Sequence, residues 1–145
     1  MKLPVKRIHP AAVLPKFQTD GAACFDLVAA TREPINARSV IYDTGLVFDI
    51  PDGYHIKVYS RSGHGFKYDL RLCNSTGIID SDYLGTIKVK LTYDGPVSYR
   101  PDWPFIGDRV AQAMLVKNVK TDLIEVEEIE KETARGEDGF GSTGK

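Results

Sequence analysis

The sequence predicts an all-β domain, a sandwich or barrel of short strands, on three observations. Apolar stretches of strand length recur along the chain, some of them alternate apolar with polar residues, and Gly, Pro or Asp interrupts them at close intervals. The clearest case is GTIKVKLTY, in which Ile87, Val89 and Leu91 share one face and Lys88 and Lys90 the other. This period of two is typical of a strand with one buried face.

Other strands are expected from the same kind of pattern, in the stretches KLPVKRI, INARSVIYDT, TGLVFDI, YHIKVYS and RVAQAMLV. Between TGLVFDI and YHIKVYS lies the turn sequence PDG, residues 51–53, so we expect these two strands to pair as a hairpin. A second hairpin is expected around IIDSDYLG, with Asp80, Asp82 and Tyr83 at its mouth.

Residues 121–134, TDLIEVEEIEKETA, fit the period of a helix and of a strand about equally. We expect a strand, because Ile124 and Val126 alternate with Glu125 and Glu127. No internal repeat or interdomain linker interrupts the chain, and 145 residues suit one domain with a core of its own.

Composition narrows the class of protein. With 42% hydrophobic residues, 27% charged residues and a formal net charge of -1, the chain is globular and gives no electrostatic reason to expect nucleic acid or membrane as a partner. The chain contains no apolar run as long as the roughly 18 residues of a membrane span, and MKLPVKRIHP lacks the apolar stretch of a secretory signal. We therefore expect a soluble, cytoplasmic protein, with Cys24 and Cys73 as free thiols.

Five stretches place Gly beside charged or hydroxyl residues: GAACFDLVA, SRSGHG, NSTGIIDSDYLG, GDRVAQ and the last eleven residues, RGEDGFGSTGK. The last contains the spacing of a phosphate-binding loop, with Gly139, Gly144 and Lys145. That interpretation fails, because neither a helix nor a metal-binding hydroxyl follows Lys145 and the preceding residues are too charged for a buried strand.

In this order and near these spacings, the five stretches resemble the five motifs of the homotrimeric dUTP pyrophosphatases, the dUTPases, from residue 21 to residue 145. The resemblance implies a jelly-roll β fold and a homotrimer whose active sites are shared between subunits. It also implies hydrolysis of dUTP to dUMP and pyrophosphate with Mg²⁺, which lowers dUTP and supplies dUMP for thymidylate synthesis.

In the third stretch, the resemblance implies that Asp80 deprotonates the attacking water. An ionised carboxylate within hydrogen-bond reach is the group that such a step needs. By the same match, Asn74 contributes to uracil recognition and Tyr83 packs on the deoxyribose. Main-chain groups can read uracil and exclude the methyl of thymine. The substrate-binding residues expected here are Asn74, Gly77, Ile78, Ile79, Tyr83 and Lys88. Without the resemblance, the two aspartates would be read as turn residues.

Phosphate contacts are implied for Arg61, Ser62 and Gly63 and for Gln112. A guanidinium, a hydroxyl and a Gly that permits close approach suit a polyphosphate, although SRSG alone would be read as a polar turn. Asp26 matches the residue near the water ligands of the metal, which the substrate phosphates mainly hold. We expect Asp108 and Arg109 to be structural, and only His64 of the three histidines to approach substrate.

The tail matches a flexible arm that closes over an active site built by other subunits. Residues 1–134 are thus the expected β domain and residues 135–145 the mobile arm. In the arm, Phe140 would stack on uracil and Arg135 would reach the terminal phosphate, while Gly141, Ser142 and Thr143 would offer backbone and hydroxyl donors.

Some positions depart from the usual family pattern: Cys24, Ser60, His64 and Asp138. The loop before GDRVAQ, residues 93–106, is also longer than usual and carries Trp103. One alternative is the related dCTP deaminase, which places a Glu in the strand after the hairpin, where this chain has TIKVKLTYDG. Another is a catalytically idle protein of the same fold that only binds nucleotide or a partner protein.

Overall fold

The computed structural model describes residues 1–96, 98–99 and 101–138. Nearly all of its regular structure is β-strand, with a single short helix in the described residues. In chain order the elements are β1 (Val5–Arg7), β2 (Phe25–Val28), β3 (Thr31–Asn36), β4 (Ser39–Asp43), β5 (Leu46–Phe48), β6 (Tyr54–Tyr59), α1 (Ser62–Tyr68), β7 (Leu70–Leu72), β8 (Thr76–Ile79), β9 (Lys88–Tyr93) and β10 (Arg109–Lys117).

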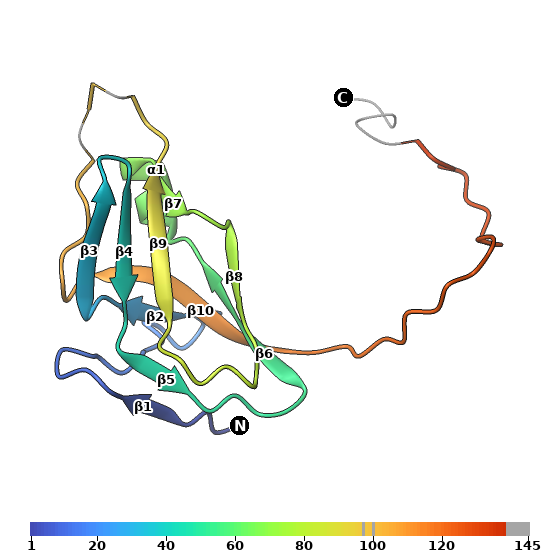
Figure 1. Cartoon of the computed structure of the whole chain (residues 1–145), viewed down its shortest axis with the longest axis horizontal. Coiled ribbons are helices and arrows are strands. Elements are labelled where there is room, and N and C mark those ends of the chain that lie inside the picture. Colours follow the sequence, from blue (N-terminus) through green and yellow to red (C-terminus); the bar gives the residue numbers. More distant parts are fainter. Residues whose placement is uncertain (97, 100, 139–145) are drawn as a thin grey trace.

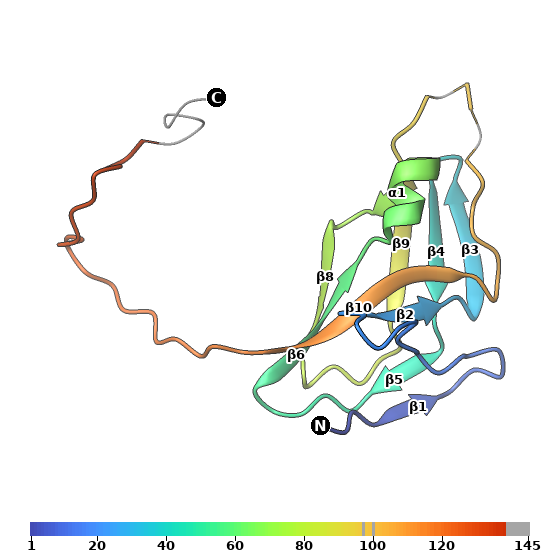
Figure 2. The ribbon, with the colours of Figure 1, turned by 180° about the vertical axis from the view of Figure 1, so that it is seen from behind.

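These strands form two four-stranded sheets, β2-β10-β6-β8 and β3-β4-β9-β7, and a two-stranded sheet, β1-β5. Every pair within them is antiparallel. Figure 1 shows β3, β4 and β9 side by side, and Figure 2 shows from behind how β10 crosses beside β2 and β6. The all-β, jelly-roll-like sandwich expected from the sequence is confirmed.

The core lies between the two larger sheets and follows the strand pattern. Ile87, Val89 and Leu91 are all buried, as their alternation with Lys88 and Lys90 predicts. On the facing sheet, Ile56 and Val58 of β6 are buried in the same way. The weaker strands expected in KLPVKRI and INARSVIYDT are also present, as β1 and as the end of β3 with β4.

The first predicted hairpin is wrong, although its turn is right. Gly53 has the positive φ of +79° that PDG suggests, and the N–H of Tyr54 donates to the oxygen of Pro51 at 3.1 Å. However, β5 pairs with β1, and β6 pairs with β10 and β8. The turn therefore carries the chain from one sheet to another, because tertiary partners determine which strands pair.

The second predicted hairpin is wrong for the same reason. The N–H of Tyr83 donates to the oxygen of Asp80 at 3.2 Å, so the turn exists. Its flanking strands, β8 and β9, lie in different sheets, where β8 pairs with β6 and β9 with β4 and β7. Residues 81–87 thus cross the edge of the sandwich rather than close a ladder.

The SRSG stretch, expected to be a turn, leads into helix α1. Asp69 ends the helix in the left-handed conformation, with φ +52°, and its N–H donates to the oxygen of His64. The helix packs beside β7. No helix in the described part of the chain is long and apolar enough to cross a membrane.

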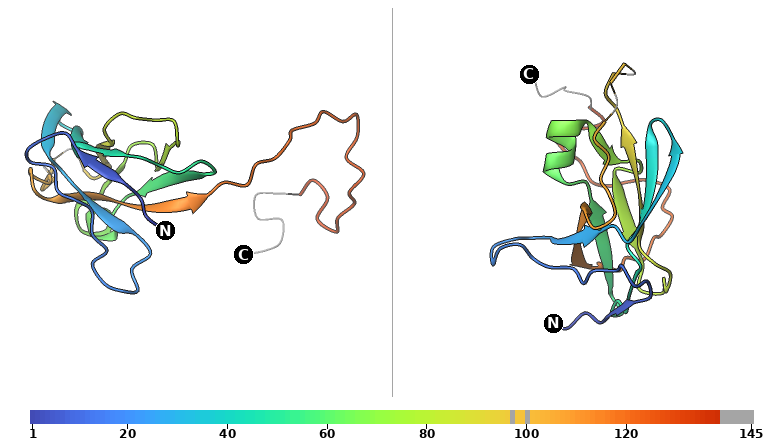
Figure 3. Two further views of the ribbon diagram at one scale, coloured as in Figure 1. Left: turned by 90° about the horizontal axis from the view of Figure 1, so that it is seen from below. Right: turned by 90° about the vertical axis from the view of Figure 1, so that its left-hand side faces the viewer.

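Beyond β10, residues 118–138 contain no strand, so the strand expected over residues 121–134 is wrong for the single chain. Leu123 is 95% exposed and Ile124 80%, because nothing in the described residues packs against them. Figure 3 shows this segment leading away from the body. The expected boundary at residue 134 stays a prediction. Cys24 and Cys73 are free thiols, as expected.

Candidate active site

Three neighbouring strands bring the expected phosphate-binding residues together. On β10, Gln112 is the cross-strand partner of Asp26 on β2 and of Tyr59 on β6. Directly opposed residues on neighbouring strands project from the same face of the sheet. Because Arg61 follows β6 by two residues, it reaches the same area as Asp26 and Gln112.

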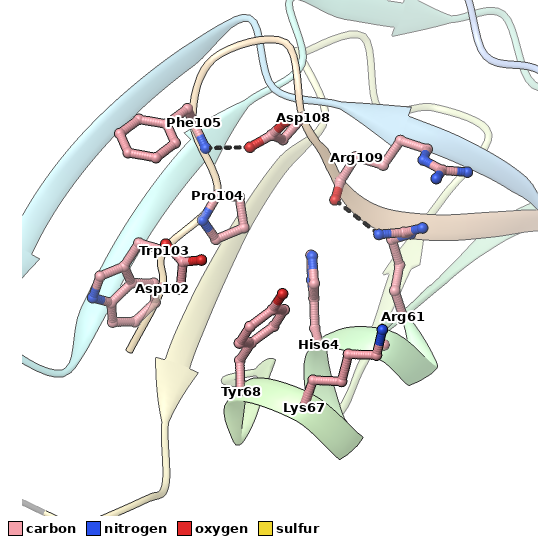
Figure 4. Close-up of a pocket in the computed structure, with 11 residues that line it drawn as sticks. Arg61, His64, Lys67, Tyr68, Asp102, Trp103, Pro104, Phe105, Asp108 and Arg109 are labelled. Atoms are coloured by element: carbon pink, nitrogen blue, oxygen red, sulfur yellow. Dashed lines mark hydrogen bonds between the residues drawn. The ribbon is translucent and has the colours of Figure 1, made fainter. Parts of the chain in front are cut away.

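The carboxylate of Asp26 is the centre of this group. It is only 8% exposed, and a buried charge needs partners. One oxygen accepts from Nε of Arg61 at 3.2 Å and the other from Nη1 of Arg109 at 3.1 Å. Arg61 also lies 3.4 Å from the main-chain oxygen of Arg109 (Figure 4). Asp26 therefore fixes both arginines, and Arg109 has the structural contact expected of it.

Gln112 and Ser60 form a second connection. The side-chain amide of Gln112 donates to the main-chain oxygen of Ser60 at 2.8 Å. The hydroxyl of Ser60 in turn accepts from the N–H of Leu72 at 2.9 Å. Sequence reasoning noted Ser60 only as a departure; its role depends on β7, which lies beside it only in the fold.

A cavity of about 320 Å³ lies beside β8, and we call it the β8 cavity. Its lining includes Asn74, Gly77, Ile78, Ile79 and Lys88, five of the residues expected to bind substrate. A Cβ on Gly77 would lie 3.2 Å from Cβ of Val58, so Gly permits the close approach of β8 to β6. The other lining residues are Ile41, Val58, Leu72, Cys73, Val89 and Lys90.

Asp80 directly follows Ile79 and is exposed. Tyr83, in the same turn, is 45% exposed, and its hydroxyl donates to the oxygen of Thr86 at 3.0 Å. Its ring crosses Gly85, where an added Cβ would lie 2.4 Å from the Tyr83 hydroxyl. The turn, which directly follows the cavity-lining Ile79, thus presents a carboxylate and a fixed ring at the surface.

Lys88 has a carboxylate partner next to this cavity. Its Nζ lies 3.7 Å from Oδ2 of Asp43. The same oxygen accepts from the hydroxyl of Thr86 at 2.8 Å. Lys88 is exposed, so this pair contributes less than ~1 kcal/mol to stability.

A second cavity, of about 400 Å³, lies between α1 and residues 102–109, and we call it the α1 cavity (Figure 4). Arg61 and Gly63, both expected to bind phosphates, line it. It shares no lining residue with the β8 cavity. In a single chain, the residues expected to bind phosphates and those expected to bind the base therefore lie at separate places.

His64 also lines the α1 cavity and is 7% exposed. Burial lowers the pKa of its imidazole, and the positive charge of Arg61 lowers this pKa further. At neutral pH the ring is consequently uncharged, with one N–H donor and one acceptor nitrogen.

The remaining expected residues are not gathered by this chain alone. Ser62 begins α1 and is exposed. Arg135 lies in the segment that leads away from the body, where its Nε donates to the oxygen of Asp138 at 2.8 Å. Phe140, Gly141, Ser142 and Thr143 lie outside the described residues.

The α1 cavity is lined by arginine, which suits phosphates, and the β8 cavity is mainly apolar with one amide, which suits a planar ring. A ligand that joins phosphates to a planar ring would use both kinds of surface on this antiparallel jelly roll. These features define a nucleotide-binding β protein. The family model for dUTPase matches residues 11–144, and the chain belongs to the dUTPase family. The enzyme class expected from the sequence, a dUTP diphosphatase, is confirmed by this membership.

Individual relatives agree. The chain is 39% identical to a Helicobacter pylori protein named deoxyuridine 5'-triphosphate nucleotidohydrolase, over 99% of this chain and 97% of that one. It is 41% identical to the Wolinella succinogenes protein of the same name, over 100% and 95% of the two chains. Among solved structures, the Staphylococcus bacteriophage 80alpha dUTPase with dUPNHPP superposes with a TM-score of 0.83 at 28% identity, over 99% and 98%.

Proposed function

We propose that this chain hydrolyses dUTP to dUMP and pyrophosphate, with the base in the β8 cavity and the phosphates near Arg61 and Gln112. The observation that carries the proposal is that Asn74, Gly77 and Ile79 line one cavity immediately before Asp80. In the cell, this reaction would lower dUTP and supply dUMP for thymidylate synthesis.

Uracil recognition rests on the shape and polarity of the β8 cavity. Ile78, Ile79 and Val89 give apolar walls for a planar ring, and Asn74 supplies an amide donor and acceptor. A site built to hydrogen-bond one edge of a base rejects an analogue that leaves those groups unpaired. Tyr83, in the turn that follows Ile79, would pack on the deoxyribose and leave no room for a 2′-hydroxyl.

The chemical step begins with a water held by Asp80. The carboxylate accepts a proton from this water while the oxygen of the water bonds to the α-phosphorus. The bond from the α-phosphorus to the bridging oxygen then breaks, and pyrophosphate leaves with the bonding electron pair. Arg61, Ser62 and Gly63 hold the phosphate chain, and Gln112 orients the water and the α-phosphate.

The donor set of this chain fits Mg²⁺ held mainly by the substrate. In the described ranges no three His, Cys, Asp or Glu side chains gather as a metal cage. Asp26 accepts one arginine on each oxygen, and a carboxylate has about four acceptor positions, so it can also accept from a metal-bound water. Mg²⁺ on the phosphates would supply charge neutralisation.

We further propose a homotrimer with shared active sites. The β8 and α1 cavities are separate in one chain, so a neighbour is needed to place base and phosphate residues around one nucleotide. The exposed apolar side chains of residues 119–129 support the same assembly, because a large apolar surface of this kind is typical of an interface. The segment that carries Arg135 leads away from the β sheets of its own chain, so it is placed to reach a neighbouring subunit.

The arm, residues 135–145, would close each site. Phe140 would stack on uracil, Arg135 would bind the terminal phosphate, and Gly141, Ser142 and Thr143 would donate hydrogen bonds. Ordering such a segment costs entropy that a bound nucleotide offsets, so closure would depend on the correct ligand.

The decisive experiment measures pyrophosphate release from dUTP, with dCTP, dTTP and UTP as comparisons. We expect release from dUTP, and rates at least about 100-fold lower for the three analogues, whose amino, methyl or hydroxyl group does not fit. Ammonia release from dCTP would indicate a deaminase instead. Nucleotide binding without any product would indicate a protein that only binds, and either result would overturn the proposal.

A further inference from the structure

We propose that Asp43 and Thr86 are positioning residues that hold the ring of Tyr83 and thereby set the preference for deoxyribonucleotides over ribonucleotides. Both residues would act through Tyr83 rather than by touching the nucleotide. The inference rests on the proposed hydrolysis of dUTP and deepens it, because it identifies what keeps the ring in the place where a 2′-hydroxyl does not fit.

Main-chain hydrogen bonds leave the segment under the ring without support. Among the described residues, the N–H groups of Leu84, Gly85 and Thr86 have no main-chain acceptor. The side chain of Leu84 is 71% exposed, so it adds little packing. The next main-chain bond along the segment is made by Ile87, whose N–H donates to the oxygen of Leu46 at 3.0 Å. Between the turn and Ile87, side-chain hydrogen bonds therefore decide where the chain lies.

Two such bonds connect the ring to Asp43 through Thr86. The hydroxyl of Tyr83 donates to the main-chain oxygen of Thr86 at 3.0 Å. The hydroxyl of Thr86 donates in turn to Oδ2 of Asp43 at 2.8 Å. The ring itself lies across Gly85, where an added Cβ would be 2.5 Å from Cζ of Tyr83. A shift of Thr86 would therefore move the ring.

Asp43 is well held by the fold. It ends β4, its Oδ1 accepts from the N–H of Gly45 at 2.8 Å, and its main-chain oxygen accepts from the N–H of Ala30 at 2.8 Å. Its side chain is 21% exposed, and a hydrogen bond to a carboxylate is stronger than one between neutral groups. Its Oδ2 also lies 3.7 Å from Nζ of Lys88, which lines the β8 cavity. One carboxylate thus connects the ring to the wall of the cavity proposed to hold the base.

Exclusion of a ribonucleotide depends on a ring that does not yield. Ribose differs from deoxyribose by one hydroxyl, and a site rejects it by placing a group where that hydroxyl would lie. Such a group discriminates only when hydrogen bonds behind it fix its position. The bonds from Tyr83 to Thr86 and from Thr86 to Asp43 are of this kind.

The test compares pyrophosphate release from dUTP and from UTP in variants of Thr86. Thr86→Val removes the hydroxyl and keeps the branched shape. We expect the ratio of kcat/KM for dUTP to that for UTP to fall about fivefold, with kcat for dUTP within about twofold, because a hydrogen bond to a carboxylate is lost and the freed ring admits ribose. Thr86→Ser keeps the hydroxyl and should keep the ratio.

Thr92→Val is the matched control. It makes the same chemical change further along β9, where the hydroxyl donates to the main-chain oxygen of Arg38 at 3.2 Å, and it should leave the ratio unchanged. A loss of stability alone would lower hydrolysis of dUTP and UTP alike, so the ratio separates a positioning role from a structural one. An unchanged ratio in Thr86→Val, or an equal loss in Thr86→Ser, would overturn the proposal.

Tyr83→Phe releases the ring from its other end and decides the question should Thr86→Val fail to fold. It should lower the ratio by a similar factor, and the double variant should lose no more than either single variant, because both changes break one connection. Losses that multiply would show that Tyr83 and Thr86 act independently and would overturn the proposal. Absence of dUTP hydrolysis by the unchanged protein would instead overturn the proposed function, and this inference with it.

Discussion

The carboxylate of Asp26 binds Nε of Arg61 at 3.2 Å across 35 residues of sequence. With the second ion pair to Arg109, this contact aligns the end of β6 with β2 and β10. The positions of the residues proposed to bind the phosphates therefore depend on Asp26, which is itself buried.

Asp26→Asn should lower stability by about 1–3 kcal/mol, less than the 3–5 kcal/mol of a fully buried broken pair, because Arg109 is 45% exposed. Urea unfolding measures this. Asp94→Asn is the matched control: it breaks the surface pair with Arg71, and we expect a loss below about 1 kcal/mol. Equal losses in the two variants would show that Asp26 is not a buried anchor.

Asp80→Asn should lower turnover by a factor on the order of 100 or more and leave nucleotide binding largely intact, because it removes the general base. Steady-state pyrophosphate release gives kcat, and titration of substrate gives the affinity. Asp82→Asn, in the same turn, should retain most activity. Near-normal turnover in Asp80→Asn would exclude this residue as the base.

Deletion of residues 135–145 should spare the β core, which ends at Lys117, and nearly abolish hydrolysis. Phe140→Ala should be milder, with a loss of ~1–3 kcal/mol in binding, the worth of one stacked base. Phe140→Trp should retain most activity. A phosphate-binding loop would instead require Lys145. If Lys145→Ala were less active than Phe140→Ala, the result would contradict the proposal that residues 135–145 form an arm that closes the site.

Light scattering should give a mass three times that of the 16.1-kDa chain. Ile124→Asp should shift the protein toward smaller species, because this exposed side chain would be covered in the trimer. Glu125→Ala, its neighbour, serves as the control and should leave the mass unchanged. A fully active monomer would refute shared active sites.

His64 predicts a pH dependence of stability. Because its folded-state pKa is lowered, the unfolded chain binds more protons once the pH falls below the ordinary pKa of histidine. Stability is then lost progressively as the pH falls toward the lowered value. His64→Leu should remove this contribution. Urea unfolding should therefore show that the free energy of unfolding of this variant declines less than that of the unchanged protein between about pH 7.5 and about pH 5. Parallel declines would contradict a neutral buried imidazole.

Local pattern predicted the elements better than their partners. Alternation identified β9 and the burial of Val89 and Leu91, because a strand with one buried face has a fixed period. The turns at Gly53 and Asp80 were also right, but the hairpins were not, because pairing depends on contacts distant in sequence. Helix α1 was missed since SGHGFKY has two glycines and little helix propensity.

The candidate site divides in the same way. Asn74, Gly77 and Ile79 could be predicted as substrate-binding residues because they lie in one continuous stretch of sequence, and in the fold they line one cavity. The pairing of Asp26 with Arg61 and Arg109 could not be predicted, because it joins three segments through the strand order β2-β10-β6. The apolar side chains of residues 121–134 fitted a strand that a single chain does not form, since they lack a covering surface.

The hydroxyl of Ser60 links the entrance of α1 to the main chain of β7 through Leu72. A chimera that took residues 60–65 from a relative with proline at position 60 would lose this acceptor and leave an N–H of β7 unpaired. Segments 60–65 and 70–72 therefore form one exchangeable unit, and grafts should transfer them together.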